Sequence, residues 1–134
     1  MKLSRKISMK PIIENMPDWR SGCPLSSALD VIGDKWTLLI IRDLSIHGTR
    51  TYSELLGAAE KISTNILASR LKVLGEFGLI EHLNPDASSR GNPYKLTESG
   101  AALGPVGFAF REWALKYLPD IHTEMSNAPI VLKH

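Results

Sequence analysis

Cysteine is scarce in this sequence, and its scarcity excludes several kinds of site. The 134 residues include a single cysteine, Cys23, so no disulfide can form within the chain and no Cys-x-x-Cys pair can hold zinc. The four histidines lie far apart and share no metal-ligand spacing: His47, His82, His122 and His134. We therefore expect no metal, no other cofactor, and a reducing, cytoplasmic location.

Long apolar runs are also absent. No stretch approaches the roughly 18 apolar residues of a membrane span, and residues 1–20 lack the apolar core of a secretory signal. Hydrophobic residues make up 43% of the chain and charged residues 22%, which is typical of a globular protein. We expect no membrane association and one domain, residues 23–118, between a mobile arm, residues 1–22, and a tail, residues 119–134.

Acidic residues are missing from one short stretch of the chain. The overall net charge of +2 is too small to indicate an anionic partner, but residues 61–72 contain Lys61, Arg70 and Lys72 and no acid. A solvated helix face usually mixes Glu with Lys. This composition therefore favours contact with something negative, such as nucleic acid.

Apolar periodicity predicts a mainly helical domain. Pro24 is suited to the first position of a helix, Asp34 to a cap, and the pair Thr51 and Glu54 to a capping box. Apolar residues recur at helical spacing over residues 24–32, 35–44, 51–58 and 63–77. The last two of these helices, joined by a short turn, predict a helix-turn-helix.

A hairpin and a long helix are expected to follow. Residues 79–83 and 94–96 read as strands, and the polar stretch between them, residues 84–92, reads as a loop. A final helix over residues 97–118 should kink or break near Gly104, because Pro105 removes one helix hydrogen bond. The fold class is therefore mainly α with a small β-hairpin wing, that is, a winged helix-turn-helix.

The helix over residues 63–77 has the character of a DNA-reading helix. Ser63 can cap its first amides, and small hydrogen-bonding side chains lie opposite its leucines. The major groove admits one α-helix, and a wing arginine can enter a minor groove. The alternative is an ordinary solvated face, and the helical angle of Arg70 points it toward the apolar arc. The predicted DNA contacts are Ser63, Thr64, Asn65, Ala68, Ser69, Arg70, Lys72 and, in the wing, Arg90.

Several separated motifs resemble those of one known family. In order they are Cys23-Pro24, Asp30 to Trp36, Leu39 to Ile41, Tyr52 to Leu55, Ile62-Ser63 with Arg70 to Lys72, Gly78 to Ile80, and Tyr94-x-Leu96-Thr97-Glu98-x-Gly100. Together they resemble the HxlR-type regulators, bacterial winged-helix proteins akin to the MarR group. The chain departs from this pattern at Pro93, where many members carry Glu, and it places Gly75 within the reading helix.

The resemblance implies a homodimer that binds an inverted-repeat operator and most commonly represses transcription. It also implies that the first and last helices form the dimer interface. Apolar side chains recur along the last helix, and we expect them to pack in this interface rather than line a ligand pocket. They are Leu103, Val106, Phe110, Trp113 and Tyr117.

Cys23 is a candidate sensor. It lies at the start of a predicted helix, whose dipole stabilises a thiolate. Some HxlR-type regulators sense oxidants, quinones or aldehydes through a cysteine in this position, so the resemblance implies an oxidant or small-molecule inducer. The alternative is a small buried apolar side chain.

Two other functions remain to be weighed. A winged helix can serve as a protein-interaction module that never binds DNA. A cysteine-dependent enzyme would need Cys23 as nucleophile and a histidine as base, but no surrounding motif supports it. We therefore expect a non-enzymatic regulator.

Overall fold

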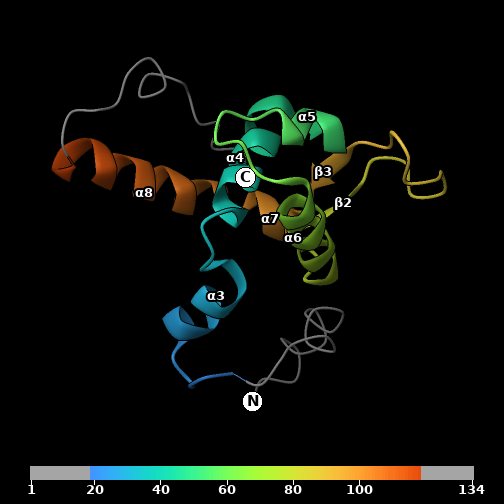
Figure 1. Ribbon diagram of the computed structural model, residues 1–134. Coiled ribbons are helices and arrows are strands. Elements are labelled where there is room, and N and C mark those ends of the chain that lie inside the picture. Colours follow the sequence, from blue (N-terminus) through green and yellow to red (C-terminus); the bar gives the residue numbers. More distant parts are fainter. Residues whose placement is uncertain (1–18, 119–134) are drawn as a thin grey trace.

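The computed structural model describes residues 19–118. The first two helices of this part, α3 and α4, are joined by the short segment of residues 33–36 (Figure 1). Helix α3, Pro24–Ile32, begins with proline at its first position and ends at Gly33, as expected. Helix α4 spans Thr37–His47. Asp34 accepts hydrogen bonds from the backbone N–H groups of Trp36 and Thr37, at 2.9 and 3.0 Å. Asp34 thus satisfies the first orphan amides of α4, the role predicted for it.

Helices α5, Tyr52–Leu56, and α6, Thr64–Glu76, form the helix-turn-helix. The capping box of Thr51 and Glu54 is present, with each residue bonding the backbone of the other. Ser63 caps α6 by accepting from the Ile66 N–H at 3.3 Å. Local capping chemistry therefore determines where both helices begin.

Three short antiparallel strands form a sheet in the order β1-β3-β2. Strand β1 is Thr49–Arg50, β2 is Ile80–His82 and β3 is Tyr94–Leu96. Ile80 pairs with Leu96 and Thr49 pairs with Lys95, so the predicted hairpin gains a third strand from the turn after α4. The loop between β2 and β3 forms the wing.

The last predicted helix is divided in two. Helix α7, Glu98–Ala101, is capped by Thr97, and α8, Gly104–Tyr117, begins with Pro105 in its first turn. The break near Gly104 is confirmed. At Gly100 an added Cβ would lie 2.0 Å from the Leu79 carbonyl oxygen, so only glycine allows α7 to approach the start of the hairpin this closely.

The core surrounds α4 and the inner face of α6. Its buried members come from α4, from the helix-turn-helix with its turn, and from the start of β2 with the residue before it: Ile40, Leu44, Leu55, Ile62, Leu67, Leu71, Leu74, Leu79 and Ile80. Helix α3 and most of α8 extend away from this core (Figure 1). Within residues 19–118 no helix is both long and apolar enough to cross a bilayer. The mainly α fold with a small antiparallel wing is the one expected from the sequence.

Candidate nucleic-acid interface

One face of α6 is left exposed by the rest of residues 19–118. Leu67, Leu71 and Leu74 are buried beneath the helix and fix its rotation against the core. The opposite face is exposed, and the structure brings together six of the predicted contact residues there. They are Ser63, Thr64, Asn65, Ala68, Ser69 and Lys72.

The turn that leads into α6 is held by long-range contacts that the sequence did not reveal. Arg42 on α4 donates two hydrogen bonds to the Glu60 carboxylate, at 2.8 and 2.9 Å. These bonds raise the pKa of Arg42 and lower the pKa of Glu60. The Tyr52 hydroxyl donates to the Thr64 carbonyl at 3.1 Å, which ties α5 to the first turn of α6. Together they fix where the N-terminus of α6 points.

Arg70 does not lie with the other predicted contacts. Its Nη2 is 3.1 Å from Thr37 Oγ1 and 3.2 Å from Asp34 Oδ1, and its side chain is 21% exposed. Its buried Nε has no partner among the described residues. Position 70 lies on the arc of α6 that turns toward α4, so the guanidinium reaches the first turn of α4 instead of solvent. The expected phosphate contact is therefore replaced here by an internal ion pair.

Asp34 is the acidic member of that pair. Burial alone would raise the pKa of this carboxyl, but hydrogen bonds from Thr37 and Trp36 and the charge of Arg70 outweigh it and lower the pKa. Asp34 is thus held ionised at the junction between α3 and α4. It joins the reading helix to that junction through Arg70.

Lys72 is exposed but already paired. Its Nζ lies 2.6 Å from Glu76 Oε2 one turn further along α6, and both side chains face solvent. An exposed pair at this spacing contributes only about 0.3–0.5 kcal/mol, so an anionic partner can displace Glu76 at small cost.

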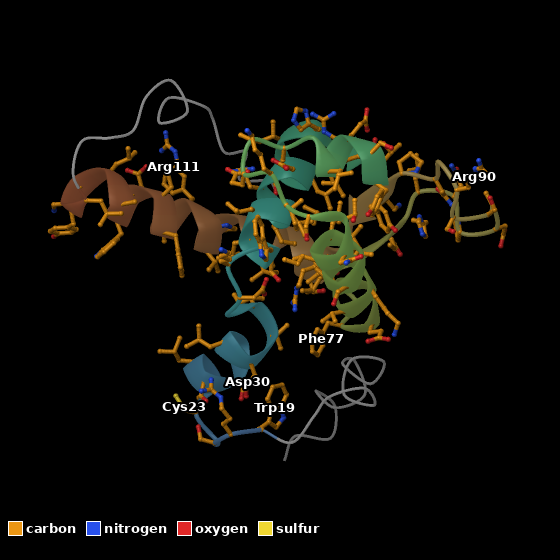
Figure 2. The ribbon with its side chains drawn as sticks, in the orientation of Figure 1. Trp19, Cys23, Asp30, Phe77, Arg90 and Arg111 are labelled. Atoms are coloured by element: carbon orange, nitrogen blue, oxygen red, sulfur yellow. The ribbon has the colours of Figure 1, made fainter. Side chains whose placement is uncertain are left out.

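The wing carries Arg90 at its exposed tip, away from the core (Figure 2). Asn92, which is 6% exposed, closes the loop: its Nδ2 donates to the Asn84 carbonyl at 2.8 Å, and its Oδ1 accepts from the Asn84 N–H at 3.2 Å. Gly91 adopts a φ of 69°, a left-handed conformation that glycine accepts without strain. The polar loop is therefore shaped by a buried asparagine.

The predicted interface residues on α8 divide into two groups. Leu103 packs against the core of its own chain, and Val106 is half-buried. Phe110, Trp113 and Tyr117 are 60%, 57% and 62% exposed. On α3, Leu25 and Leu29 are exposed as well. The two projecting helices thus present apolar side chains with no cover from residues 19–118.

Cys23 occupies the N-cap position of α3 and is exposed, rather than buried as a small apolar residue would be. No group of three or more potential metal ligands occurs among residues 19–118. The described part of the chain therefore offers one exposed thiol and a polar helix face, without a clustered metal site.

Comparison with known proteins gives a consistent result. A family model described as HxlR-like helix-turn-helix matches residues 31–122. The uncharacterized HTH-type transcriptional regulator MT3179 of Mycobacterium tuberculosis is 33% identical over 116 residues, covering 84% of this chain and 68% of that protein. Among solved structures, PA1607 superposes with a TM-score of 0.66 at 34% identity, covering 84% of this chain and 81% of that one. The quinone-bound YodB of Bacillus subtilis gives 0.58 at 31% identity, covering 71% and 99%.

Proposed function

This chain belongs to the HxlR-like helix-turn-helix family of transcriptional regulators, and we propose that it binds operator DNA sequence-specifically as a homodimer. The observation that carries the proposal is the exposed polar face of α6, whose N-terminal turns hold short hydrogen-bonding groups and no acid. The capped N-terminus of α6 and the wing tip are both free of cover from the core.

In this proposal the N-terminal half of α6 enters the major groove. Asn65 can bond an adenine through two hydrogen bonds, and the Ala68 methyl can touch a thymine methyl. Ser63, Thr64 and Ser69 supply further hydroxyl contacts. Lys72 leaves Glu76 to meet a phosphate, and Arg90 reaches an adjacent minor groove. Arg70 contributes by holding α6 against α4, not by touching DNA.

The proposed homodimer is supported by the apolar residues of α3 and α8 that nothing in residues 19–118 covers. A patch that includes Phe110, Trp113 and Tyr117 is costly to leave in water. A two-fold dimer should recognise an inverted repeat with half-sites about 10 bp apart or a multiple of that. Occupying promoter DNA in this way would repress transcription in the cytoplasm, with no enzymatic step.

We also propose that Cys23 responds to oxidants or electrophiles. Its exposure at the start of α3 supports this, and YodB, a relative of known structure, binds a quinone. Modification at α3 would alter the proposed dimer interface and with it the spacing of the two reading helices. Operator binding of wild type and Cys23→Ser should be compared after diamide treatment. Equal loss, or no loss in either protein, would contradict the sensor role.

The DNA proposal is tested by selecting bound fragments from a genomic pool and measuring affinity against salt. Affinity should fall on the order of 10³-fold between about 50 and 200 mM salt. Asn65→Ala should cost about 1–3 kcal/mol on the best site and relax the choice at one base pair. A protein-interaction module would show no salt-sensitive DNA binding, and equal loss on all sequences for Asn65→Ala would place the wrong face of α6 in the groove.

A further inference from the structure

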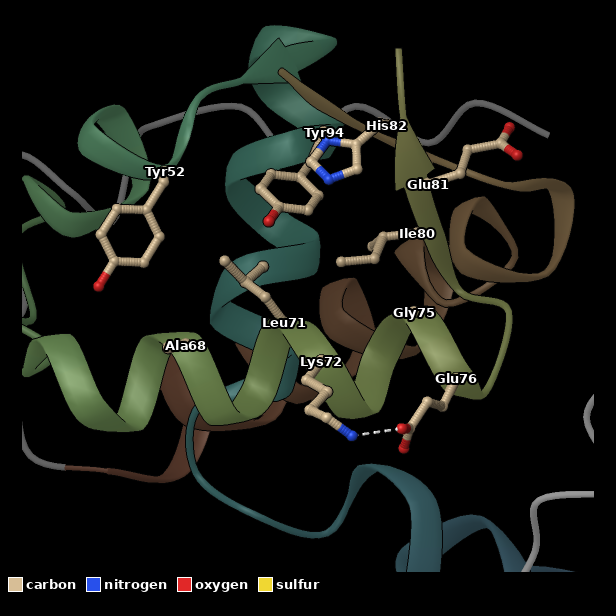
Figure 3. Close-up of a pocket in the computed structure, with 10 residues that line it drawn as sticks. All are labelled: Tyr52, Ala68, Leu71, Lys72, Gly75, Glu76, Ile80, Glu81, His82 and Tyr94. Atoms are coloured by element: carbon tan, nitrogen blue, oxygen red, sulfur yellow. Dashed lines mark hydrogen bonds and ion pairs between the residues drawn. The ribbon is translucent and has the colours of Figure 1, made fainter. Parts of the chain in front are cut away.

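A cavity of about 430 Å³ lies beside α6, at the base of the wing (Figure 3). One wall is the flank of α6 from Ala68 to Glu76, and the other is formed by β2 and β3. Leu71 and Ile80 are the apolar side chains that line it from these two walls. Its volume lies within the usual range for small-molecule sites.

Gly75 is one of the residues of α6 that line this cavity. Glycine inside a helix costs about 0.5–1 kcal/mol relative to alanine, and a glycine is usually explained by a close approach or a positive φ. Neither applies here: α6 is continuous through Gly75, and an added Cβ would meet nothing within 4 Å. Gly75 therefore relieves no steric conflict, and a larger side chain at this point of the cavity wall has open space around it.

Three aromatic rings line the remaining sides. His82 and Tyr94 stack with their centroids 4.3 Å apart, and a hydrogen-bond contact of 3.2 Å between His82 Nδ1 and the Asn92 carbonyl holds the imidazole in place. Tyr52 stands across the cavity from them (Figure 3). Burial, with a smaller effect of Tyr52, raises the pKa of Tyr94, so its hydroxyl stays neutral. That hydroxyl has no hydrogen-bond partner among residues 19–118.

The charges at the rim cancel one another. Glu76 is paired with Lys72 at 2.6 Å, and Glu81 lies 3.7 Å from Lys95 across the hairpin. A charged ligand would have to break one of these pairs, whereas an uncharged one would not. Aromatic walls favour a flat ring in stacked or edge-on contact.

We propose that this cavity binds an uncharged aromatic compound of one or two rings that bears one hydrogen-bonding group for the Tyr94 hydroxyl. The ligand would lie against Ala68 and Lys72, which the proposed function places at the DNA, so ligand and operator would exclude each other. This last consequence rests on the proposed function, but the binding itself does not. The site lies on a different part of the chain from Cys23, so it would give a non-covalent response.

The test uses 2-naphthol as probe and decahydro-2-naphthol, its saturated analogue, as the matched control ligand. Methyl resonances of Ala68, Leu71 and Ile80 should shift saturably with 2-naphthol, and the saturated analogue should bind about tenfold more weakly or worse. Gly75→Leu fills the cavity and should abolish these shifts, whereas Gly75→Ala should retain them. Thermal unfolding of both variants verifies that they are folded.

Three results would overturn the proposal. The first is the absence of saturable shifts at these methyls in the wild type. The second is unchanged binding in a folded Gly75→Leu protein. The third is a set of shifts centred on the exposed aromatics of α8. Because these readouts contain no DNA, they distinguish failure of the ligand site from failure of operator binding, which is measured separately in the salt titration.

Discussion

The substitutions Arg70→Met and Lys72→Met test two cations of α6 that differ in their surroundings. The Arg70 side chain pairs inside the protein, and the Lys72 side chain faces solvent. The two residues lie two positions apart on α6, and the sequence predicts a phosphate contact for both. In the structure Arg70 pairs with Asp34 and Thr37, while Lys72 is 75% exposed. Methionine keeps most of each aliphatic stem and removes only the charged group.

The cost of Arg70→Met can be worked from its contacts. Hydrogen bonds to charged groups contribute about 1.5–3 kcal/mol, and this pair is only about one-quarter exposed, so solvent screening weakens it little. Two effects reduce the loss of stability in Arg70→Met. Asp34 keeps its two backbone donors, and methionine removes the buried Nε that has no partner among the described residues. We expect the free energy of unfolding to fall by about 1.5 kcal/mol.

The two variants should then differ in two independent measurements. Urea unfolding should show the destabilisation for Arg70→Met and almost none for Lys72→Met. Fluorescence anisotropy with operator DNA should show the reverse. The log–log salt slope should decrease by about 0.9 for each phosphate that Lys72→Met no longer neutralises and stay unchanged in Arg70→Met. If Arg70→Met instead lowered the slope with unchanged unfolding, Arg70 would face the DNA and its internal role would be wrong.

Three further outcomes follow from other contacts. Glu76→Gln should release Lys72 and raise operator affinity about twofold, since the pair contributes only about 0.3–0.5 kcal/mol; unchanged affinity in anisotropy would show that Lys72 makes no phosphate contact. Trp113→Ala should weaken both self-association in sedimentation and DNA binding, because half-site contacts act together only in a linked pair; tight DNA binding by a stable monomer would contradict this. The hydrogen bond from Arg42 lowers the folded-state pKa of Glu60 below its ordinary 4.5, so this stabilisation is complete above that pH and is lost as the pH falls through the lowered value. Glu60→Gln should therefore flatten the acid limb of a stability–pH curve, and an unaltered limb would exclude the pair as its cause.

The elements of this fold that sequence could predict are those specified by local chemistry. Ser63 and Thr51 cap the helices that follow them, and Pro105 breaks the last helix where expected. Helix α4, however, continues to His47, three residues beyond the expected end, and stops only where Gly48 adopts a φ of 84°. Gly48 therefore determines where α4 ends, and the apolar periodicity of the sequence does not show this end.

Contacts between distant segments were not predictable in the same way. The Arg42–Glu60 pair joins residues 18 positions apart, and strand β1 pairs with β3, which lies much further along the chain. Neither leaves a periodic signal in the sequence. The cavity at Gly75 is also a tertiary property, since it depends on how the wing aromatics pack beside α6. The sequence marks this glycine as unusual within a helix, but that it lines a cavity is visible only in the folded chain.

The positive charge of residues 61–72, which favours nucleic acid as a partner, is also changed by contacts that only the folded chain shows. In the sequence, residues 61–72 contain three cations and no acid. In the folded chain Asp34 neutralises Arg70 internally, and Glu76 pairs with Lys72 at the surface, so two of the three positive charges already face a carboxylate. The attraction of α6 for a phosphate must therefore depend on the capped helix N-terminus and on displacement of Glu76, with the Arg90 wing as a separate contribution. With so weak a field on one chain, the proposed homodimer would supply much of the affinity, because two modest half-site contacts become strong only when they are linked.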